Sequence, residues 1–209
     1  MARRIPDATI RRLPAYLRAL EAVRERRLTS FELGRRTGFS SEQVRKDLAY
    51  FGAFGTRGVG YEVAALEEQI RRILGLDQGV RAAMAGAGHL GTALARYARA
   101  MHKDVSIVAI FDNDPARIGE EVAGLVVESV DRLEERVRAL DVAIGIIAVP
   151  AQAAQAVADR FTRAGVRGLL NFAPVSLVTD ARVYVQNIDL TLELQALAYF
   201  VRAAETARV

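Results

Sequence analysis

Apolar residues recur every three or four positions near the start of the chain, at Ile10, Leu13, Leu17, Leu20 and Val23. This spacing places them on one face and predicts an amphipathic helix. Pro14 lies inside the pattern. Because proline has no backbone N–H to donate, we expect it to kink this helix or to start its main part.

Two short helices are predicted next. Thr29 and Glu32 have the spacing of a capping box, and the helix that they start should end at a turn made by Gly38. Ser40 and Gln43 repeat the pattern at the start of the next helix. Two short helices joined by a tight turn that contains glycine predict a helix-turn-helix, whose second helix enters the major groove of DNA.

The candidate DNA contacts lie on this second helix and just beyond it. Ser41, Arg45 and Lys46 occupy exposed positions, although Arg45 and Lys46 are also compatible with an ordinary solvated surface. Residues 50–61 combine aromatic residues with four glycines, which predicts a β-hairpin, or wing. Arg57 is expected at its tip, where a cation can enter the minor groove.

Charge is distributed unevenly along the chain. Residues 1–76 contain 15 Lys and Arg against 9 Asp and Glu, a net charge of +6, whereas residues 77–209 carry −2. Clustered positive charge favours a polyanion as partner. The helical periodicity also ends here and alternating strands and helices begin, so we expect a winged-helix DNA-binding domain at 1–76 and an α/β domain after it.

The second domain opens with a glycine-rich turn. Residues 80–85 predict a buried strand, and a helix should follow the turn as far as about Met101. In G-x-G-x-x-G the first glycine permits a tight turn, the second lets a pyrophosphate approach the backbone, and the third lets helix and strand pack closely. Free N–H groups at the helix start attract the phosphates. The expected cofactor contacts are Gly86, Ala87, Gly88, His89, Leu90 and Gly91.

An acidic residue follows the next strand. Residues 105–111 predict this strand, and Asp112 comes 21 residues after the last glycine of the motif. A carboxylate there accepts hydrogen bonds from the adenosine ribose and repels a 2′-phosphate, which favours NAD(H) over NADP(H). Asp114 is a candidate second partner. Two alternatives stay open, a glycine turn without a dinucleotide and a site for another nucleotide such as coenzyme A.

Strands and helices continue to alternate. Helices are expected at 131–140 and 151–164, and strands at 125–127, 142–149, 168–171 and 183–186. This alternation predicts a doubly wound parallel sheet covered on both faces, a Rossmann-type domain over 77–188. Ligands bind beyond the carboxyl ends of such strands. The residues expected to flank a nicotinamide there are Val149, Pro150, Asn171 and Phe172.

Residues 189–209 are predicted to form a helix with a wide apolar face. We expect a second subunit to cover this face, with the helix exchanged across a homodimer, because two recognition helices match a palindromic site. Packing against the sheet of the same chain is the alternative.

Absent residue types narrow the function. Without Cys the chain has no disulfide, thiolate metal site or cysteine nucleophile, and we expect no metal. It has no Tyr-x-x-x-Lys, and neither His89 nor His102 has an obvious acidic neighbour, so we expect no catalytic residue and no enzyme. The N-terminus is unlike a signal peptide, and no apolar run is long enough to cross a bilayer. We therefore expect a cytoplasmic protein without a membrane partner.

Together these features resemble the Rex family of redox-sensing transcriptional repressors. The resemblance covers nearly the whole chain and is carried by Arg12-Leu13-Pro14, the segment VRKDLAYFG at 44–52, Gly86 to Gly91, NFAP at 171–174 and Ile188-Asp189-Leu190. It implies a homodimer that binds an inverted-repeat operator in double-stranded DNA. It implies further that NADH releases the repressor, while NAD+ competes for the same site and permits DNA binding.

The resemblance also implies a hydrogen-bonded trio that links the two domains, formed by Arg12, Tyr97 and Asp189, with Asp189 contributed across the dimer. Two other functions remain as alternatives. One is a small NAD-dependent oxidoreductase with a basic N-terminal domain, and the other is a nucleotide-binding module of a larger assembly.

Overall fold

The computed structural model describes residues 5–52, 55–56, 60–101 and 104–206. The chain forms two compact units, Met1–Gln78 and Gly79–Val209, each with its own hydrophobic core. The division comes at Gly79, whose φ of 69° gives a left-handed backbone, and the C-terminal helix belongs to the second unit.

The first unit begins with α1 (Asp7–Glu21), which continues through Pro14. Because α1 starts at Asp7, Pro14 does not start this helix, and the expected kink at Pro14 stays a prediction. α2 (Ser30–Thr37) has the predicted capping box: the Glu32 N–H donates to the Thr29 hydroxyl (3.2 Å), and the Thr29 N–H donates to the Glu32 carboxylate (2.7 Å).

α3 (Ser41–Ala49) follows a left-handed turn at Gly38, where φ is 79°. At its start the Gln43 N–H donates to the Ser40 hydroxyl (3.1 Å). The Gln43 side chain bonds Asp47 and does not complete a capping box. The helix-turn-helix predicted from these caps is confirmed.

Short strands and a further helix complete the first unit, namely β1 (Arg27–Leu28), β2 (Gly55–Thr56), β3 (Gly60–Glu62) and α4 (Val63–Ile73). β3 pairs antiparallel with both β1 and β2, and β2 with β3 forms the expected wing. Arg57 and Phe54 lie outside the described residues.

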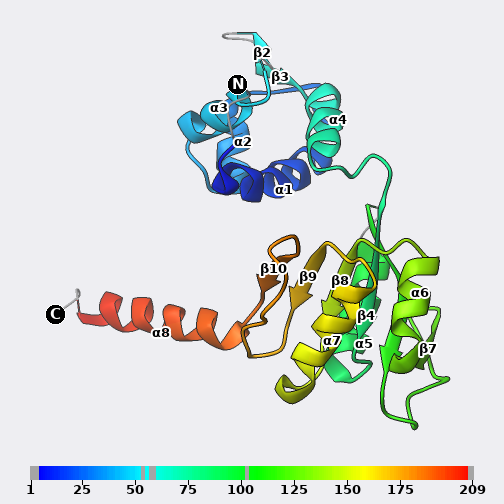
Figure 1. The fold of residues 1–209 in the computed structure, drawn as a ribbon. Coiled ribbons are helices and arrows are strands. Elements are labelled where there is room, and N and C mark those ends of the chain that lie inside the picture. The colour runs from blue at the N-terminus through cyan, green and yellow to red at the C-terminus, as the bar shows by residue number, and fades with distance from the viewer. Residues whose placement is uncertain (1–4, 53–54, 57–59, 102–103, 207–209) are drawn as a thin grey trace. The chain divides into compact units, whose positions relative to one another are not determined.

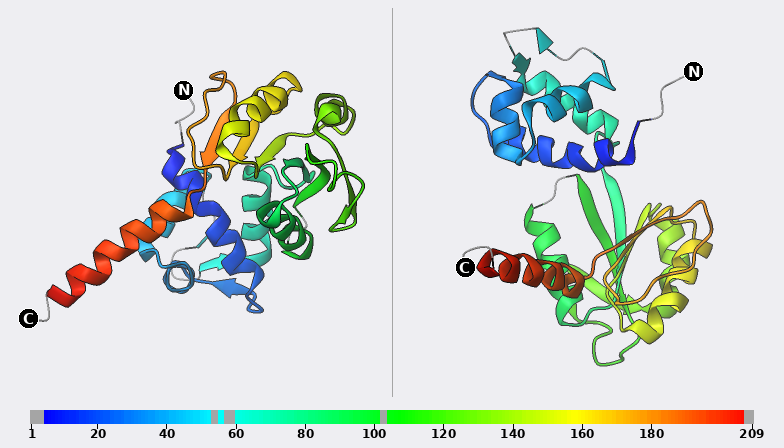
Figure 2. Two further views of the ribbon diagram at one scale, coloured as in Figure 1. Left: turned by 90° about the horizontal axis from the view of Figure 1, so that it is seen from below. Right: turned by 90° about the vertical axis from the view of Figure 1, so that its left-hand side faces the viewer.

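The helices of this unit lie close together (Figure 2), and their buried side chains form one core. All four of them contribute buried side chains, which include Leu13, Leu20, Leu33, Val44, Leu48, Leu66 and Ile70. Full burial of one such side chain is worth about 1.5–3 kcal/mol. Val44 and Leu48, four residues apart on α3, supply the apolar part of the contact that holds this helix.

The second unit is built on a seven-stranded sheet in the order β10-β9-β8-β4-β5-β7-β6. Its strands are β4 (Val80–Ala85), β5 (Val105–Asp112), β6 (Glu121–Val122), β7 (Leu125–Ser129), β8 (Ile144–Ile147), β9 (Gly168–Asn171) and β10 (Tyr184–Asn187). Neighbouring strands are parallel except in the β6–β7 hairpin. The strand order reverses between β4 and β8, as in a doubly wound Rossmann sheet, and the predicted architecture is confirmed.

Helices lie on both faces of this sheet (Figure 1). α6 (Leu133–Ala139), which follows a 3-10 turn, and α7 (Ala151–Arg163) pack on one face over a core that contains Phe111 and Phe161. α5 (His89–Met101) packs on the other face, in a core that includes no described residue of β9 or β10. The sheet is therefore covered less completely on the α5 face.

The strand expected at 142–149 is shorter than predicted. β8 pairs with β4 only as far as Ile147, opposite Ala85, so the apolar residues on either side of it lie in loops. The hairpin strand β6 was not predicted. The chain continues into α8 (Leu190–Thr206), a single uninterrupted helix (Figure 2). Within the described ranges, no helix has both the length and the apolarity to span a bilayer.

Candidate functional site

A cavity of about 450 Å³ lies where the strand order of the sheet reverses. The glycine-rich turn, the carboxyl ends of β5 and β8 and the start of α7 surround it, at the place where Rossmann sheets bind ligands. Its volume is in the range of small-molecule sites. The predicted residues that line it are Gly86, Gly88, Asp112, Asp114, Val149 and Pro150.

Each of the three glycines of the turn is required at its position for a different steric reason. At Gly86, where φ is 101°, a Cβ would overlap the carbonyl oxygen of Ala148, and at Gly91 it would overlap the carbonyl oxygen of Gly86. A Cβ at Gly88 would meet nothing within 4 Å. Because Gly88 lines the cavity, its missing side chain leaves the backbone open to a ligand, beside the start of α5 at His89.

Asp112 is held at the end of β5 by backbone donors. The Ala87 N–H donates to Asp112 Oδ2 (2.6 Å), and the Asp114 N–H donates to Asp112 Oδ1 (3.0 Å). A carboxylate has about four acceptor positions, so both oxygens keep capacity for ribose hydroxyls. The geometry fits the predicted role of Asp112.

Two arginines that sequence reasoning missed also line the cavity. Arg117 Nη1 donates to the Ala87 carbonyl (2.9 Å), and Arg160 Nη1 donates to the Val130 carbonyl (2.6 Å). Asp112 and Arg117 thus bond the N–H and the C=O of the same residue in the turn. Arg117 lies 30 residues from Ala87 along the chain, so no local pattern marks it.

The other predicted cofactor contacts do not line the cavity through their side chains. His89 and Leu90 are exposed at the start of α5, and Gly91 is buried. Asn171 is fully buried, with its amide bonded to the loop that follows β9, and neither Asn171 nor Phe172 is among the lining residues. Their place beside a nicotinamide stays a prediction.

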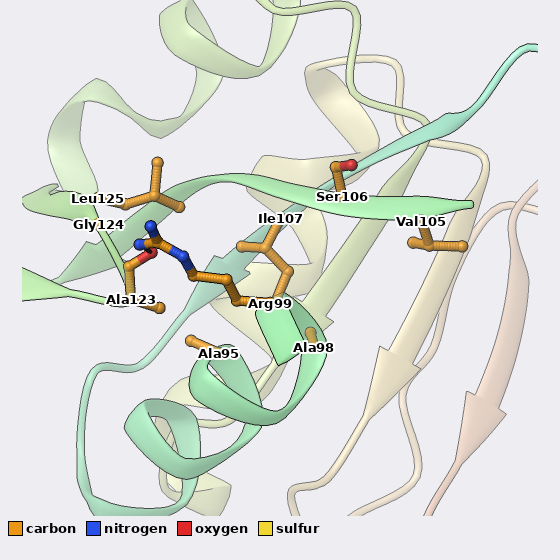
Figure 3. A pocket seen from close by; sticks show the side chains of 9 residues that line it. All are labelled: Ala95, Ala98, Arg99, Val105, Ser106, Ile107, Ala123, Gly124 and Leu125. Carbon is orange, nitrogen blue, oxygen red and sulfur yellow. Dashed lines mark hydrogen bonds between the residues drawn. The ribbon is translucent and has the colours of Figure 1, made fainter. Parts of the chain in front are cut away.

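A second hollow, of about 340 Å³, lies at the other end of β5, between α5 and the β6–β7 hairpin (Figure 3). Arg99 reaches across to this hairpin and donates to the Ala123 carbonyl. Ala123 and Gly124 have φ values of 53° and 79°, as in a type I′ turn. Arg99 therefore supports the turn, and we assign the ligand site to the first cavity.

The second candidate site is the surface of α3. Arg45 and Lys46 are exposed there, and Ser41 is half-buried. Arg45 Nη1 donates to the Ser30 hydroxyl at the start of α2 (3.1 Å), which places its guanidinium along the helix-turn-helix. Exposed cationic side chains in this position are suited to phosphate oxygens.

Behind this surface, a buried carboxylate joins α3 to α1. Asp47 is 0% exposed, and its two oxygens accept five hydrogen bonds. Arg12 donates two, from Nε to Oδ2 (2.6 Å) and from Nη2 to Oδ1 (2.7 Å). The others come from Thr9 (3.0 Å), Tyr16 (2.7 Å) and Gln43 (2.9 Å). Sequence reasoning gave Asp47 no role.

These bonds keep Asp47 ionised. Burial by itself raises the pKa of a carboxyl, but the hydrogen bonds from Arg12, Tyr16, Gln43 and Thr9 outweigh it and lower the pKa of Asp47 below 3.8. Burial also raises the pKa of Tyr16, and its hydrogen bond to Asp47 adds to this effect. Tyr16 is therefore a donor, and Asp47 an acceptor, throughout the neutral pH range.

Two family models match the chain. One, described as a putative DNA-binding protein N-terminus, matches residues 4–49, and the other, described as a CoA binding domain, matches residues 77–175. A redox-sensing transcriptional repressor Rex from Natranaerobius thermophilus is 47% identical over 200 residues, which are 94% of this chain and 91% of the relative. The chain belongs to the Rex family of redox-sensing transcriptional repressors.

Solved structures of the Rex-family repressor RSP agree with this. RSP in complex with NAD+ and operator DNA is 34% identical, with a TM-score of 0.89 over 99% of this chain and 96% of that one. RSP in complex with NADH is 33% identical, with a TM-score of 0.85 over 98% and 97%. Rex membership confirms the expected family, and with it the expectation of a transcriptional regulator and not an enzyme.

The Rex resemblance implied a trio of Arg12, Tyr97 and Asp189. Arg12 bonds Asp47 within the first unit, and Tyr97 is 51% exposed on α5. Asp189 accepts a hydrogen bond from the Thr191 N–H at the start of α8 (2.8 Å). Because the trio spans both units and the dimer, it stays a prediction.

Proposed function

We propose that this Rex-family chain is a homodimeric repressor that binds an inverted-repeat operator through α3 and responds to the NADH/NAD+ balance through the cavity beside Gly88. NADH in the cavity releases the dimer from DNA, whereas NAD+ occupies the same cavity and permits DNA binding. The observation that carries the proposal is the cavity itself. It combines an open backbone at Gly88 with a fixed carboxylate at Asp112, in a chain that also has a helix-turn-helix.

Dinucleotide binding is supported by complementary groups in one cavity. The free N–H groups at the start of α5 attract a diphosphate, and the missing Cβ of Gly88 lets it reach the backbone. Asp112 accepts hydrogen bonds from ribose hydroxyls. A 2′-phosphate beside Asp112 and Asp114 would bring like charges together, which favours NAD(H) over NADP(H).

Coenzyme A is the second candidate ligand, because the CoA binding model covers the segment that forms this cavity. Both ligands carry an adenine nucleotide, and the glycine-rich turn suits either diphosphate. The complexes of RSP with NAD+ and with NADH favour the dinucleotide.

DNA binding is supported by the first unit. Its sequence carries a net charge of +6 over residues 1–76, and α3 exposes Arg45 and Lys46. The related RSP is bound to operator DNA in one solved structure. We assign the contacts with DNA to Ser41, Arg45, Lys46 and Arg57.

A homodimer is supported by two incompletely covered surfaces of the same chain, which are the apolar side chains of α8 and the α5 face of the sheet at β10. Seven large apolar side chains of α8 are more than half exposed, at Leu190, Leu192, Leu194, Leu197, Tyr199, Phe200 and Val201. On the sheet, Val185 packs toward the α7 face, so its neighbour Tyr184 points to the α5 face, where it is 58% exposed. A second copy that places its α8 on this face would bury both surfaces, and the Arg12, Tyr97 and Asp189 trio then couples the units across the dimer.

The test is a DNA-release titration with the full chain. A labelled inverted-repeat duplex is first selected from random-sequence DNA with the wild-type protein, and its fluorescence anisotropy is followed at fixed salt while NADH, NAD+ or coenzyme A is added. The proposal expects release by NADH and not by NAD+. Release by coenzyme A alone would show that the cavity binds coenzyme A and would favour the nucleotide-binding alternative. If no duplex can be selected, the proposal that the chain binds DNA is wrong.

A further inference from the structure

We propose that Asp47 is the positioning residue of the DNA-binding unit. Its carboxylate sets the rotation of α3 against α1, and with it the direction in which Arg45 and Lys46 point. The inference rests on the proposed binding of DNA by α3. Asp47 is 0% exposed, so it acts on DNA only through the placement of its neighbours on the helix.

The carboxylate is reached from one stripe of α1. Thr9, Arg12 and Tyr16 are spaced i, i+3 and i+7, and so lie on the same face of that helix. All three donate to Asp47, while Gln43 donates to it from within α3. A single acceptor on α3 thus fixes the helix to about two turns of α1.

The beginning of α3 is tied to the same two side chains of α1. Phe39 comes just before the N-cap of α3, and its ring meets the ring of Tyr16 edge to face, with the centroids 5.7 Å apart. The Arg12 guanidinium lies 5.8 Å from the centre of the Phe39 ring. Arg12 and Tyr16 therefore contact the chain at both ends of the recognition helix.

Apolar packing alone would not fix the rotation equally well. Val44 and Leu48 are buried, but apolar burial has little directional preference. The paired hydrogen bonds from Arg12 constrain both distance and plane. On a helix with a radius of about 5 Å including side chains, a rotation of about 20° moves a side-chain tip by about 2 Å, which is enough to break a hydrogen bond.

The decisive measurement is operator affinity of the full-length Asp47→Asn variant, without nucleotide, at a temperature well below its unfolding transition. We expect operator binding weaker by about tenfold or more, the scale of one lost DNA contact. Circular dichroism and NADH affinity measured without DNA show that both units are folded.

Leu66→Ala is the matched control. Leu66 is buried in the same core but lies on α4 and makes no hydrogen bond to the carboxylate, so its truncation costs stability without releasing α3 from Arg12. Where both variants are fully folded, a purely structural role for Asp47 predicts unchanged operator affinity in both. The positioning role predicts a loss in Asp47→Asn only.

Milder variants keep the test decisive if Asp47→Asn fails to fold. Tyr16→Phe and Thr9→Val each remove one donor and keep the shape of the side chain. Each should weaken operator binding by less than Asp47→Asn, and Tyr16→Phe should add little in an Asp47→Asn background.

Wild-type operator affinity in folded Asp47→Asn, or in both milder variants, would overturn the positioning role while leaving the proposed function intact. An equal loss of affinity in the Leu66→Ala control would overturn it as well. If the wild-type chain selects no operator, the proposed function is wrong, and the inference, which rests on it, is wrong as well.

Discussion

Each unit is organised around a carboxylate, but the two are held by different kinds of donor. Asp47 accepts hydrogen bonds from four side chains, three of which lie 31 to 38 residues away in the sequence. Asp112 accepts two from backbone N–H groups of a turn and of its own loop. The geometry around Asp47 therefore depends on the identity of distant residues, whereas that around Asp112 depends on the course of the main chain.

Truncation of the two carboxylates should give the largest difference. Asp47→Ala leaves Arg12 partly buried without its partner and should cost about 3–5 kcal/mol in the free energy of unfolding. Asp112→Ala should cost about 1 kcal/mol, because water can reach the half-buried end of β5 and satisfy the freed N–H groups. Urea unfolding followed by circular dichroism measures both, with exposed Asp77→Ala as a control. Equal losses at Asp47 and Asp112 would contradict the comparison.

Acid should remove the contribution of Asp47. Since the pKa of this carboxyl is lower in the folded chain than its ordinary value of 3.8, its contribution is complete above that pH and disappears as the pH falls through the folded-state pKa. The wild type should thus be more stable than Asp47→Asn by a constant amount above about pH 5, and the difference should shrink below about pH 4. Urea unfolding at several pH values tests this. A stability difference between the two proteins that grows in acid would show that the pKa of Asp47 is raised by folding and not lowered.

Substitutions at two glycines should separate binding from folding in the second unit. Gly88→Val places a side chain in open space that lines the cavity, so NADH affinity should fall about tenfold or more, or about 1.4 kcal/mol, with little change in melting temperature. Gly91→Ala forces a Cβ onto the Gly86 carbonyl and should destabilise the unit itself. NADH fluorescence titration and thermal unfolding distinguish the two. Tight NADH binding by Gly88→Val would place the diphosphate elsewhere.

A smaller effect is expected on cofactor choice. Asp112→Ala removes the negative charge that opposes a 2′-phosphate, so the preference for NADH over NADPH should narrow. The ratio of the two dissociation constants is the measurement, and Asp77→Ala again serves as the control. An unchanged ratio would remove Asp112 from the ribose site.

The smallest expected effect concerns the salt dependence of DNA binding. If Lys46 contacts a phosphate, Lys46→Ala should weaken binding to all duplexes alike and reduce the slope of log affinity against log salt by about one. Arg45→Ala should do the same if its contact is also with phosphate, or should relax sequence preference if it contacts a base. If both variants bind DNA with unchanged affinity, an element other than α3 makes the contacts with DNA.

Features that depend on neighbouring residues were predictable from the sequence. The capping residues Thr29 and Ser40 marked the starts of α2 and α3, and the glycines from 86 to 91 marked the turn of the cavity. At both caps, and at Gly91 against the Gly86 carbonyl, the hydrogen bond or close approach involves residues only a few positions apart, so the pattern and its physical cause lie in the same short segment. Gly86 is the exception, because its close neighbour is the distant Ala148 carbonyl.

Features that depend on pairing between distant segments were not predictable. An apolar run shows that a strand is buried but not where its partner ends, and β8 stops at Ile147 because its partner β4 ends at Ala85. In the sequence, Asp47 looks like an ordinary charged residue on a helix, because its partner Arg12 lies on a different helix, α1. Arg117 lines the cavity only because the loop after β5 folds back to Ala87. The predicted placement of Asn171 and Phe172 beside a nicotinamide remains a prediction, because neither residue lines the cavity.

The exposed apolar side chains of α8 make the stability of the protein depend on its concentration if a second chain covers them. In the proposed homodimer they would be covered only while two chains are together, so assembly would stabilise the folded chain and its melting temperature would rise with protein concentration. Where single chains predominate, the number of intact repressors grows with the square of the number of chains. If the proposed dimer is the form that binds DNA, the copy number of the chain would help to set the redox threshold at which operators are released.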